Sequence, residues 1–143
     1  MKCDFCEIVC NENRTIAENE LAWAFLTYTP ITPGHTLVIP KRCVSTFEEL
    51  TQEEIVAIKE LSTEVKHALI KAFDLDGFNF AFNEGEKCGQ SVPHFHLHIV
   101  PRKVGDDGIY EYEPRSFLYR PGSRAQSSQE ELKEIVKLVQ DKL

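Results

Sequence analysis

The chain has 143 residues, of which 42% are hydrophobic and 27% charged, and its formal net charge is -7. The negative charge argues against a general nucleic-acid-binding protein, because such a protein depends on Lys and Arg side chains that contact phosphates, but it allows a small anionic ligand. No apolar run is long enough to cross a bilayer and the N-terminus lacks the pattern of a secretory signal, so we expect a cytoplasmic protein. In a reducing compartment the five cysteines are expected to be thiols or metal ligands.

In chain order, the first predicted element is a β-hairpin over residues 15–26, with a polar turn at residues 18–20. Residues 28–34 contain two prolines and a glycine, which favour a loop. Residues 36–39 are apolar or β-branched and predict a buried strand that ends at Pro40.

A long helix follows this strand. Thr51 and Glu54 have the spacing of a capping box, and apolar residues continue at the helical period as far as Ala72. Residues 78–82, rich in phenylalanine, predict another strand.

The C-terminal third has a different character. Residues 103–124 are polar, with prolines and glycines, and predict little regular structure. Ser128 and Glu131 form a second capping-box pattern before an amphipathic helix over about residues 128–143. Short hairpins with two segregated helices indicate an α+β fold on an antiparallel sheet of about five strands. The length fits a single domain over residues 1–143, with the C-terminal helix appended to its core.

The pattern that points to function is a row of alternating histidines, His94, His96 and His98, separated by large apolar residues. In a β-strand successive side chains point to opposite faces, so the three imidazoles are expected to share one face. Packing a hydrophobic core does not require a row of imidazoles. The row therefore predicts a functional site.

Two chemistries fit such a row. A central histidine can act as a nucleophile that forms a covalent intermediate, provided that its attacking nitrogen is unprotonated. Alternatively, one or two of the histidines can bind a metal ion. Three ligands to one zinc are disfavoured, because the row extends over about 13 Å at ~3.3 Å per residue.

The loop before the histidines adds a possible anion site. Gly85 and Gly89 allow a close approach of the backbone, and successive amides around Gln90 and Ser91 are expected to hold a phosphate oxygen.

Residues 89–100, Gly-Gln-Ser-Val-Pro-His-Phe-His-Leu-His-Ile-Val, resemble the signature of the histidine triad (HIT) superfamily, in which three histidines alternate with apolar residues. Residues 34–41, 83–85 and 3–6 are similar to further segments of that family in the same order. The resemblance covers about residues 3–113. It implies a HIT-like fold, a homodimer with a continuous sheet, and the activity of a nucleotide hydrolase or nucleotidyltransferase.

The resemblance also implies roles for individual residues. His96 corresponds to the nucleophile that attacks the α-phosphorus, and His98 to a residue that contacts the same phosphate. The implied nucleotide-binding residues are Asn83, Gly89, Gln90 and Ser91 at the phosphate, ribose or leaving group, and Phe5, Ile8 and Phe25 around the base. Thr27 stands where the family commonly has an acidic residue that holds the ribose, and a hydroxyl makes a weaker bond there than a carboxylate.

The pair Cys3-x2-Cys6 resembles a half-site for zinc in some bacterial-type relatives. In those relatives two histidines complete the site, one of them the first histidine of the row, which is His94 here. The other position is Cys43 in this chain, and cysteine is also a good zinc ligand. The resemblance thus implies a structural Zn²⁺ held by Cys3, Cys6, Cys43 and His94.

Two branches of the superfamily compete for the substrate. Residues 101–106, followed by Ile109-Tyr110-Glu111, resemble the fragile histidine triad branch, which cleaves dinucleoside polyphosphates. The cysteine pair instead resembles relatives nearer the branch that hydrolyses nucleoside phosphoramidates and acyl-nucleotides. We favour dinucleoside polyphosphate hydrolysis, with Mg²⁺ accompanying the substrate. The alternatives are a nucleotidyltransferase or phosphorylase, or a nucleotide-binding regulatory protein with residual catalysis.

Among the other histidines, His35 is expected to be a hydrogen-bonded structural residue.

Overall fold

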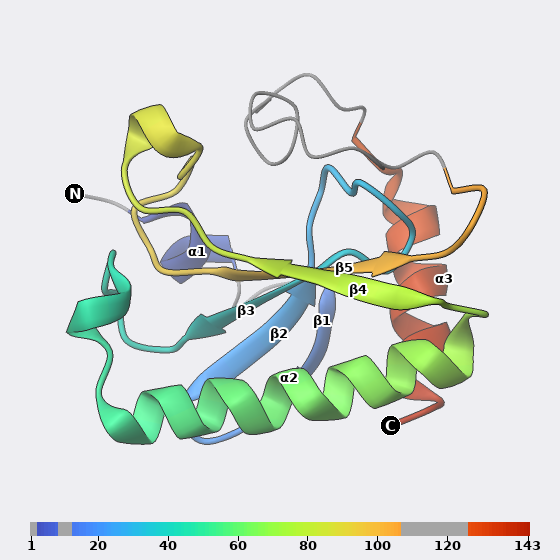
Figure 1. Ribbon diagram of the computed structural model, residues 1–143, viewed down its shortest axis with the longest axis horizontal. Coiled ribbons are helices and arrows are strands. Elements are labelled where there is room, and N and C mark those ends of the chain that lie inside the picture. The colour runs from blue at the N-terminus through green and yellow to red at the C-terminus, as the bar shows by residue number, and fades with distance from the viewer. Residues whose placement is uncertain (1–2, 9–12, 107–125) are drawn as a thin grey trace.

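A computed structural model describes residues 3–8, 13–106 and 126–143 (Figure 1). The strands are β1 (Thr15–Glu18), β2 (Ala22–Leu26), β3 (Thr36–Pro40), β4 (Gly77–Ala81) and β5 (Leu97–Arg102). The α-helices are α1 (Asp4–Ile8), α2 (Gln52–Ala72) and α3 (Gln129–Gln140), and the short 3-10 helices are η2 (Phe47–Glu49) and η3 (Glu86–Cys88).

The strands form one antiparallel sheet in the order β1-β2-β3-β5-β4. The last of the described strands, β5, lies between β3 and β4, so it pairs on both sides. His98 lies in β5, opposite Leu37 of β3 and Ala81 of β4. The expected α+β fold with a five-stranded antiparallel sheet is confirmed.

The long helix α2 runs along one face of the sheet (Figure 1). Its buried apolar residues recur at the helical period and join the main core with Phe95 and Ile99. Thr51 caps its first turn: the Thr51 hydroxyl accepts a hydrogen bond from the Glu54 N–H, and the Glu54 carboxylate accepts one from the Thr51 N–H. The predicted capping box is therefore confirmed.

A smaller apolar cluster, separate from the main core, joins α1 to the sheet. It contains Cys3, Phe5, Phe25, Leu37, Ile39 and Val92. Helix α1 has only five residues, which are too few to show a helical period, so the sequence does not predict it.

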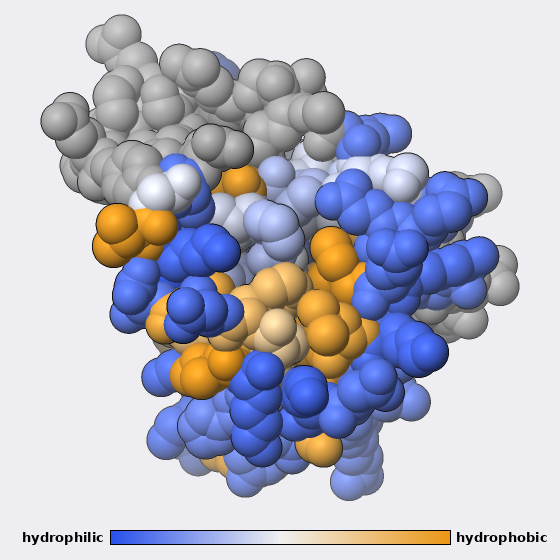
Figure 2. Space-filling view, turned by 90° about the vertical axis from the view of Figure 1, so that its right-hand side faces the viewer, coloured by the Kyte–Doolittle hydropathy of each residue, from blue (hydrophilic) through white to orange (hydrophobic). Residues whose placement is uncertain are grey.

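Helix α3 packs against α2 and β1, and its Gln140 side-chain amide donates hydrogen bonds to the carbonyls of Thr15 and Ile16. Figure 2 shows the end of the molecule that carries α3 and the last turn of α2. This face is largely hydrophilic, with some apolar residues near its centre. In the part of the chain that the structure describes, none of the helices combines the length and the apolarity needed to span a membrane.

The predicted hairpin, the strand at residues 36–39 and both main helices are present. The strand predicted at residues 78–82 is displaced by one residue toward the N-terminus. Part of the segment predicted to lack regular structure, residues 107–124, lies outside the described residues, and so do Ile109, Tyr110 and Glu111.

The prediction that all three histidines lie in a regular strand is wrong, because β5 begins at Leu97. The His94 N–H donates to the carbonyl of Val92, and the Phe95 N–H donates to the carbonyl of Val44. In a regular strand these two N–H groups would be available to pair with a neighbouring strand, but here both already have other partners.

Candidate functional site

His94, His96 and His98, called here the histidine cluster, are 1%, 4% and 8% exposed. The rings of His96 and His98 have centroids 5.0 Å apart, and the Phe5 ring contacts both His94 and His96. The alternating Phe95 belongs instead to the main core under α2. The predicted separation of imidazoles from apolar side chains is therefore present, although the first two histidines precede the strand.

A backbone carbonyl determines which ring nitrogen of His96 carries the proton. His96 Nδ1 lies 2.8 Å from the carbonyl oxygen of His94, and because a carbonyl can only accept, Nδ1–H is the donor. In the neutral ring the lone pair is then on Nε2. Burial is the main cause that lowers the pKa of His96 below 6.5, which favours this neutral form.

A second histidine pair determines the tautomer of His98. The Ile31 N–H donates to His35 Nδ1 at 3.0 Å, so the proton of His35 is on Nε2. His35 Nε2 lies 2.9 Å from His98 Nδ1 and donates to it, which leaves the His98 proton on Nε2. The expectation that His35 is a hydrogen-bonded structural residue is confirmed. Its partner is a member of the histidine cluster, which the sequence did not show.

Gly34 allows His35 to reach this position. Its φ is +88°, in the region that favours glycine, and a Cβ built on it would lie 2.9 Å from the Leu69 side chain of α2. The loop therefore passes directly over α2 before β3 begins.

Phe5, which the resemblance places at the base, lies beside the histidine cluster, and Phe25 packs against Phe5. The ring of Phe5 stands edge-on to that of His96, with centroids 5.2 Å apart and planes at 90°, and it also contacts Phe25 at 5.3 Å. The side chain of Ile8 lies outside the described residues. Thr27 accepts a hydrogen bond from the Thr29 N–H at 3.3 Å through its hydroxyl.

The loop before the histidines is hydrogen-bonded to itself. The Gly85 N–H donates to the Gln90 side-chain oxygen at 2.8 Å, and the Gln90 N–H donates to the Gly85 carbonyl at 3.1 Å. The Gly89 N–H donates to the Glu86 carbonyl, and Gly89 has the left-handed φ of +98°. These bonds pair the amides of Gly85, Gly89 and Gln90 within the loop, and the expectation that amides around Gln90 and Ser91 hold a phosphate oxygen stays a prediction.

Two predicted phosphate-site side chains contact this loop or its neighbours. The Gln90 side-chain nitrogen donates to the carbonyl of Ser45 at 2.8 Å, which ties the loop to the segment before η2. Asn83 approaches the carbonyl of Gly89 with its side-chain nitrogen at 3.5 Å. Ser91, which connects this loop to the histidine cluster, is exposed.

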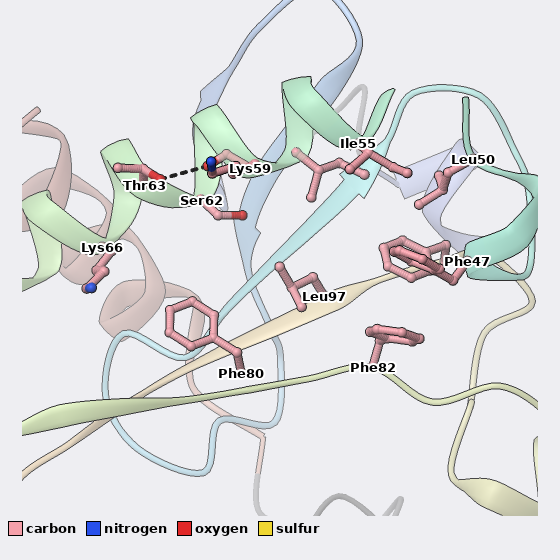
Figure 3. Close-up of a pocket in the computed structure, with 12 residues that line it drawn as sticks. Phe47, Leu50, Ile55, Lys59, Ser62, Thr63, Lys66, Phe80, Phe82 and Leu97 are labelled. Atoms are coloured by element: carbon pink, nitrogen blue, oxygen red, sulfur yellow. Dashed lines mark hydrogen bonds between the residues drawn. The ribbon is translucent and has the colours of Figure 1, made fainter. Parts of the chain in front are cut away.

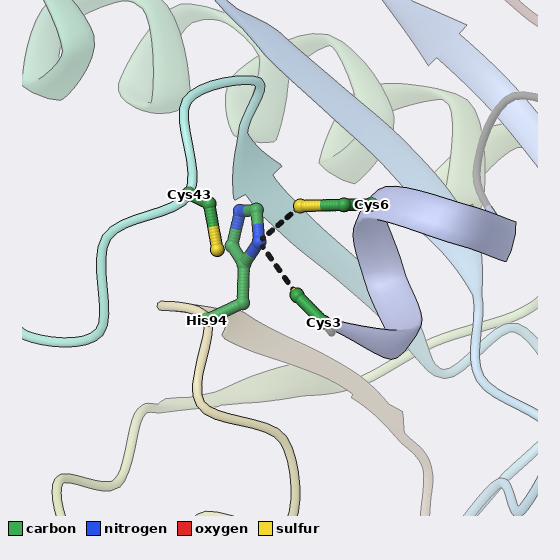
Figure 4. Close-up of side chains that lie close together, drawn as sticks. All are labelled: Cys3, Cys6, Cys43 and His94. Atoms are coloured by element: carbon green, nitrogen blue, oxygen red, sulfur yellow. Dashed lines mark hydrogen bonds between the residues drawn. The ribbon is translucent and has the colours of Figure 1, made fainter. Parts of the chain in front are cut away.

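A four-ligand cluster lies beside the histidine cluster and consists of Cys3, Cys6, Cys43 and His94 (Figure 4). Their ligand atoms all lie within 4.8 Å of one another, although the residues come from α1 and the residue before it, the segment after β3 and the segment before β5. The structure thus brings together all four residues that the resemblance implied as metal ligands.

The arrangement fits zinc in two respects. His94 Nε2 donates to the carbonyl of Pro40 at 2.8 Å, so the lone pair of Nδ1 faces the sulfur atoms. This Nδ1 lies 3.3 Å from Cys3 Sγ and 3.6 Å from Cys6 Sγ. Tetrahedral zinc with bonds of ~2.3 Å to sulfur and ~2.0–2.1 Å to nitrogen requires an S–N separation of about 3.6 Å.

The pKa values of the thiols bear on cation binding. Burial and the neighbouring Cys3 and Cys43 raise the pKa of Cys6 to about 12, and burial raises the pKa of Cys43. Closely spaced thiols disfavour one another's ionisation, and a divalent metal ion would stabilise the thiolates. These four residues could therefore hold a metal ion.

An apolar groove of about 340 Å³ lies on the other side of the sheet, between α2 and the strands β4 and β5 (Figure 3). Its lining includes Phe47, Ile55, Ile58, Phe80, Phe82 and Leu97. Since Leu97 alternates with His96 and His98 along the chain, the groove and the histidine cluster lie on opposite faces.

Residues 10–105 match the HIT domain family. A bis(5'-adenosyl)-triphosphatase of Dictyostelium discoideum is 39% identical over 107 residues, which are 68% of this chain and 72% of that protein. The crystal structure of a hypothetical histidine triad nucleotide-binding protein from Sulfolobus tokodaii has a TM-score of 0.80 and 27% identity, and the match covers 98% of this chain and 91% of the other.

A zinc-bound histidine triad family protein from Mycobacterium smegmatis has a TM-score of 0.76 and 28% identity, over 99% of this chain and 93% of that one. The family match spans more than half of the sequence, includes the histidine cluster, and agrees with the observed five-stranded fold. The chain therefore belongs to the HIT domain family.

Proposed function

We propose that this protein is a nucleotide hydrolase in which His96 forms a transient covalent bond to the α-phosphorus of its substrate. The observation that carries the proposal is the 2.8 Å hydrogen bond from His96 Nδ1–H to the carbonyl of His94, which leaves the lone pair on Nε2. The name of the Dictyostelium relative, a bis(5'-adenosyl)-triphosphatase, supports the same reaction class.

The reaction proceeds in two displacements. In the first, His96 Nε2 bonds to the α-phosphorus while the bond from phosphorus to the bridging oxygen breaks, and the rest of the substrate leaves. In the second, water attacks the phosphorus, the phosphorus–nitrogen bond breaks, and a nucleoside monophosphate leaves. His98 donates its Nε2–H to a phosphate oxygen, and this donor is oriented by His35.

We favour a dinucleoside polyphosphate as the substrate, with Mg²⁺ bound to its phosphates. The segment at residues 101–106 and the name of the Dictyostelium relative support this choice. Nucleoside phosphoramidates and acyl-nucleotides are the competing substrates, and transfer to phosphate or a sugar phosphate is the competing reaction. A nucleotide-binding regulatory protein would not need the oriented lone pair of His96.

The nucleophile is tested with His96→Asn. We expect turnover of diadenosine triphosphate to fall by at least about 1000-fold, because the attacking nitrogen is lost, while adenosine monophosphate still binds. His67→Asn is the matched control, since His67 is an exposed histidine on α2. Near-full activity of His96→Asn would refute the assignment.

The substrate is tested with a panel of diadenosine polyphosphates, adenosine phosphoramidate and nucleoside diphosphate sugars, with and without Mg²⁺. A burst of protein-bound label after an alkaline quench is expected, because the phosphorus–nitrogen bond hydrolyses in acid. Restoration of His96→Gly by added imidazole would further support the covalent role.

We also propose that the four-ligand cluster holds a structural zinc ion. When bound, zinc would cross-link three segments of the chain that are far apart in sequence, and it would supply no reacting group. The zinc-bound Mycobacterium smegmatis neighbour supports the proposal.

The zinc proposal is tested by elemental analysis of protein that is purified without added metal. We expect one zinc per chain. Cys43→Ser should lower the zinc content and the melting temperature, whereas Cys88→Ser, at an exposed cysteine outside the cluster, should change neither. Folded protein that contains no zinc as purified would contradict the proposal.

Finally, we propose a homodimer that pairs the β4 strands of two copies. Among the described strands β4 is at the edge of the sheet and pairs with β5. Beside it Phe47, Phe80 and Phe82 are 45%, 48% and 40% exposed around the apolar groove. A second copy would bury these rings and continue the sheet.

A further inference from the structure

We propose that metal occupancy of the four-ligand cluster controls the affinity of the nucleotide site through Phe5. In this proposal, metal bound to Cys3 and Cys6 holds α1 against the sheet, so that Phe5 forms one wall of the nucleotide site beside His96. Loss of the metal releases α1 and weakens nucleotide binding. This inference rests on the proposed function, because it names a regulation of the same site.

The first support is the placement of Phe5 between two metal ligands. Cys3 and Cys6 flank Phe5 in the sequence, and all three belong to α1 or the residue before it. Phe5 is 8% exposed, although Asp4, Cys6 and Glu7 around it are exposed. The metal ligands and the aromatic wall are therefore carried by the same short segment.

The second support is that α1 has little stability of its own. A helix of five residues is far below the length at which isolated helices form in water. Its position depends on tertiary contacts. These contacts include the packing of Phe5 on Phe25 and His96 and the approach of two cysteines to His94. Removing the metal would weaken the second set, so that α1 would depend mainly on its apolar packing against the sheet.

His94 forms a second connection between the metal and the nucleophile. Its ring Nδ1 faces the thiols, and its backbone carbonyl accepts the hydrogen bond that orients His96. The ring is also held by its bond to the carbonyl of Pro40, which does not involve metal. His96 should therefore keep its tautomer without metal, whereas Phe5 should lose its position.

These two connections predict that metal removal affects nucleotide affinity more than the rate constant at saturating substrate. Nucleotide affinity should fall by about tenfold on metal removal, since the contact of one aromatic ring is lost. The rate constant at saturating substrate should change less than threefold, because the His94–His96 bond persists. A purely structural role for the metal would not separate affinity from turnover.

The experiment measures binding of adenosine monophosphate by calorimetry in zinc-loaded and chelator-stripped protein, each as wild type and as Phe5→Ala, with zinc-loaded Phe5→Leu as a fifth sample. We expect zinc removal to weaken the binding of adenosine monophosphate about tenfold in the wild type and less than twofold in Phe5→Ala. Zinc-loaded Phe5→Ala should bind as weakly as stripped wild type, while Phe5→Leu should retain most of the affinity. Equal weakening of wild type and Phe5→Ala on stripping, or no weakening of the wild type, would overturn the proposal.

A second measurement needs no nucleotide. The ring-proton chemical shifts of His96, assigned by their loss in His96→Asn, should change on zinc removal in the wild type but not in Phe5→Ala, because the shift comes from the edge-on ring of Phe5. If zinc-loaded wild type fails to bind adenosine monophosphate, the proposed function fails, and these shifts still test the link from metal to Phe5.

Circular dichroism of stripped protein should retain the signal of α2 and the sheet. Loss of that signal would show that the metal supports the whole fold and would refute a specific effect on α1.

Discussion

The three imidazoles of the histidine cluster differ because each ring nitrogen meets a different group. His94 directs one nitrogen at a carbonyl and the other at the thiols, and His96 donates to a carbonyl only two residues away. His98 accepts from His35, which is 63 residues distant in sequence. The spacing of the three residues predicted a shared site, but their division of roles follows from these partners.

The pKa of His96 gives a prediction about pH. Burial lowers this pKa below 6.5, and the neutral ring is the nucleophile, so the protein should stay active as the pH falls through 6.5. The acid limb of kcat/KM for diadenosine triphosphate should lie below pH 6.5. This substrate has no terminal phosphate that titrates in the range, so the limb reports on the protein. An acid limb above pH 6.5 would contradict the burial argument.

At the scale of elements, the loop from β2 to β3 depends on Gly34. We expect Gly34→Ala to destabilise the protein by more than about 1 kcal/mol, because alanine is strained at a φ of +88° and its Cβ would crowd Leu69. It should also lower turnover, since the strain moves His35 away from His98.

The matched control is Gly77→Ala in β4, where an added Cβ meets no atom within 4 Å. Urea denaturation of both variants checks the prediction, with a change within about 0.5 kcal/mol expected for the control. Equal stability of Gly34→Ala and wild type would show that the loop can move off α2.

The elements that the sequence predicted well are those in which an apolar repeat continues over many residues or a capping motif is complete. Helix α2 repeats its apolar residues over 21 residues and begins at a complete capping box. Helix α1 has five residues and no period, so its existence depends on contacts of Phe5 and the cysteines with distant segments. Likewise, the glycines of the loop before the histidines predicted backbone freedom, but not that the Gly85 N–H would donate to the Gln90 side chain.

At the scale of the whole molecule, the sheet separates two surfaces with different chemistry. One face carries the histidine cluster and the four-ligand cluster together with α1. The other is covered by α2 and contains the apolar groove beside β4. Because successive residues of β5 alternate between these faces, one strand supplies both His98 and Leu97. A second copy seated on the groove would thus leave the histidine face open to substrate.

The dimer is tested with Phe80→Glu, which places a charge among the exposed rings that a second copy would bury. We expect wild type to have twice the mass of one chain by light scattering at micromolar concentration, and Phe80→Glu to have the mass of a monomer, because an unpaired charge in an apolar interface is costly. Leu138→Glu is the control, since Leu138 is 39% exposed on α3 and does not line the groove. A monomeric wild type would refute the dimer. A Phe80→Glu variant that remains dimeric while Leu138→Glu dissociates would move the interface from the β4 edge to α3.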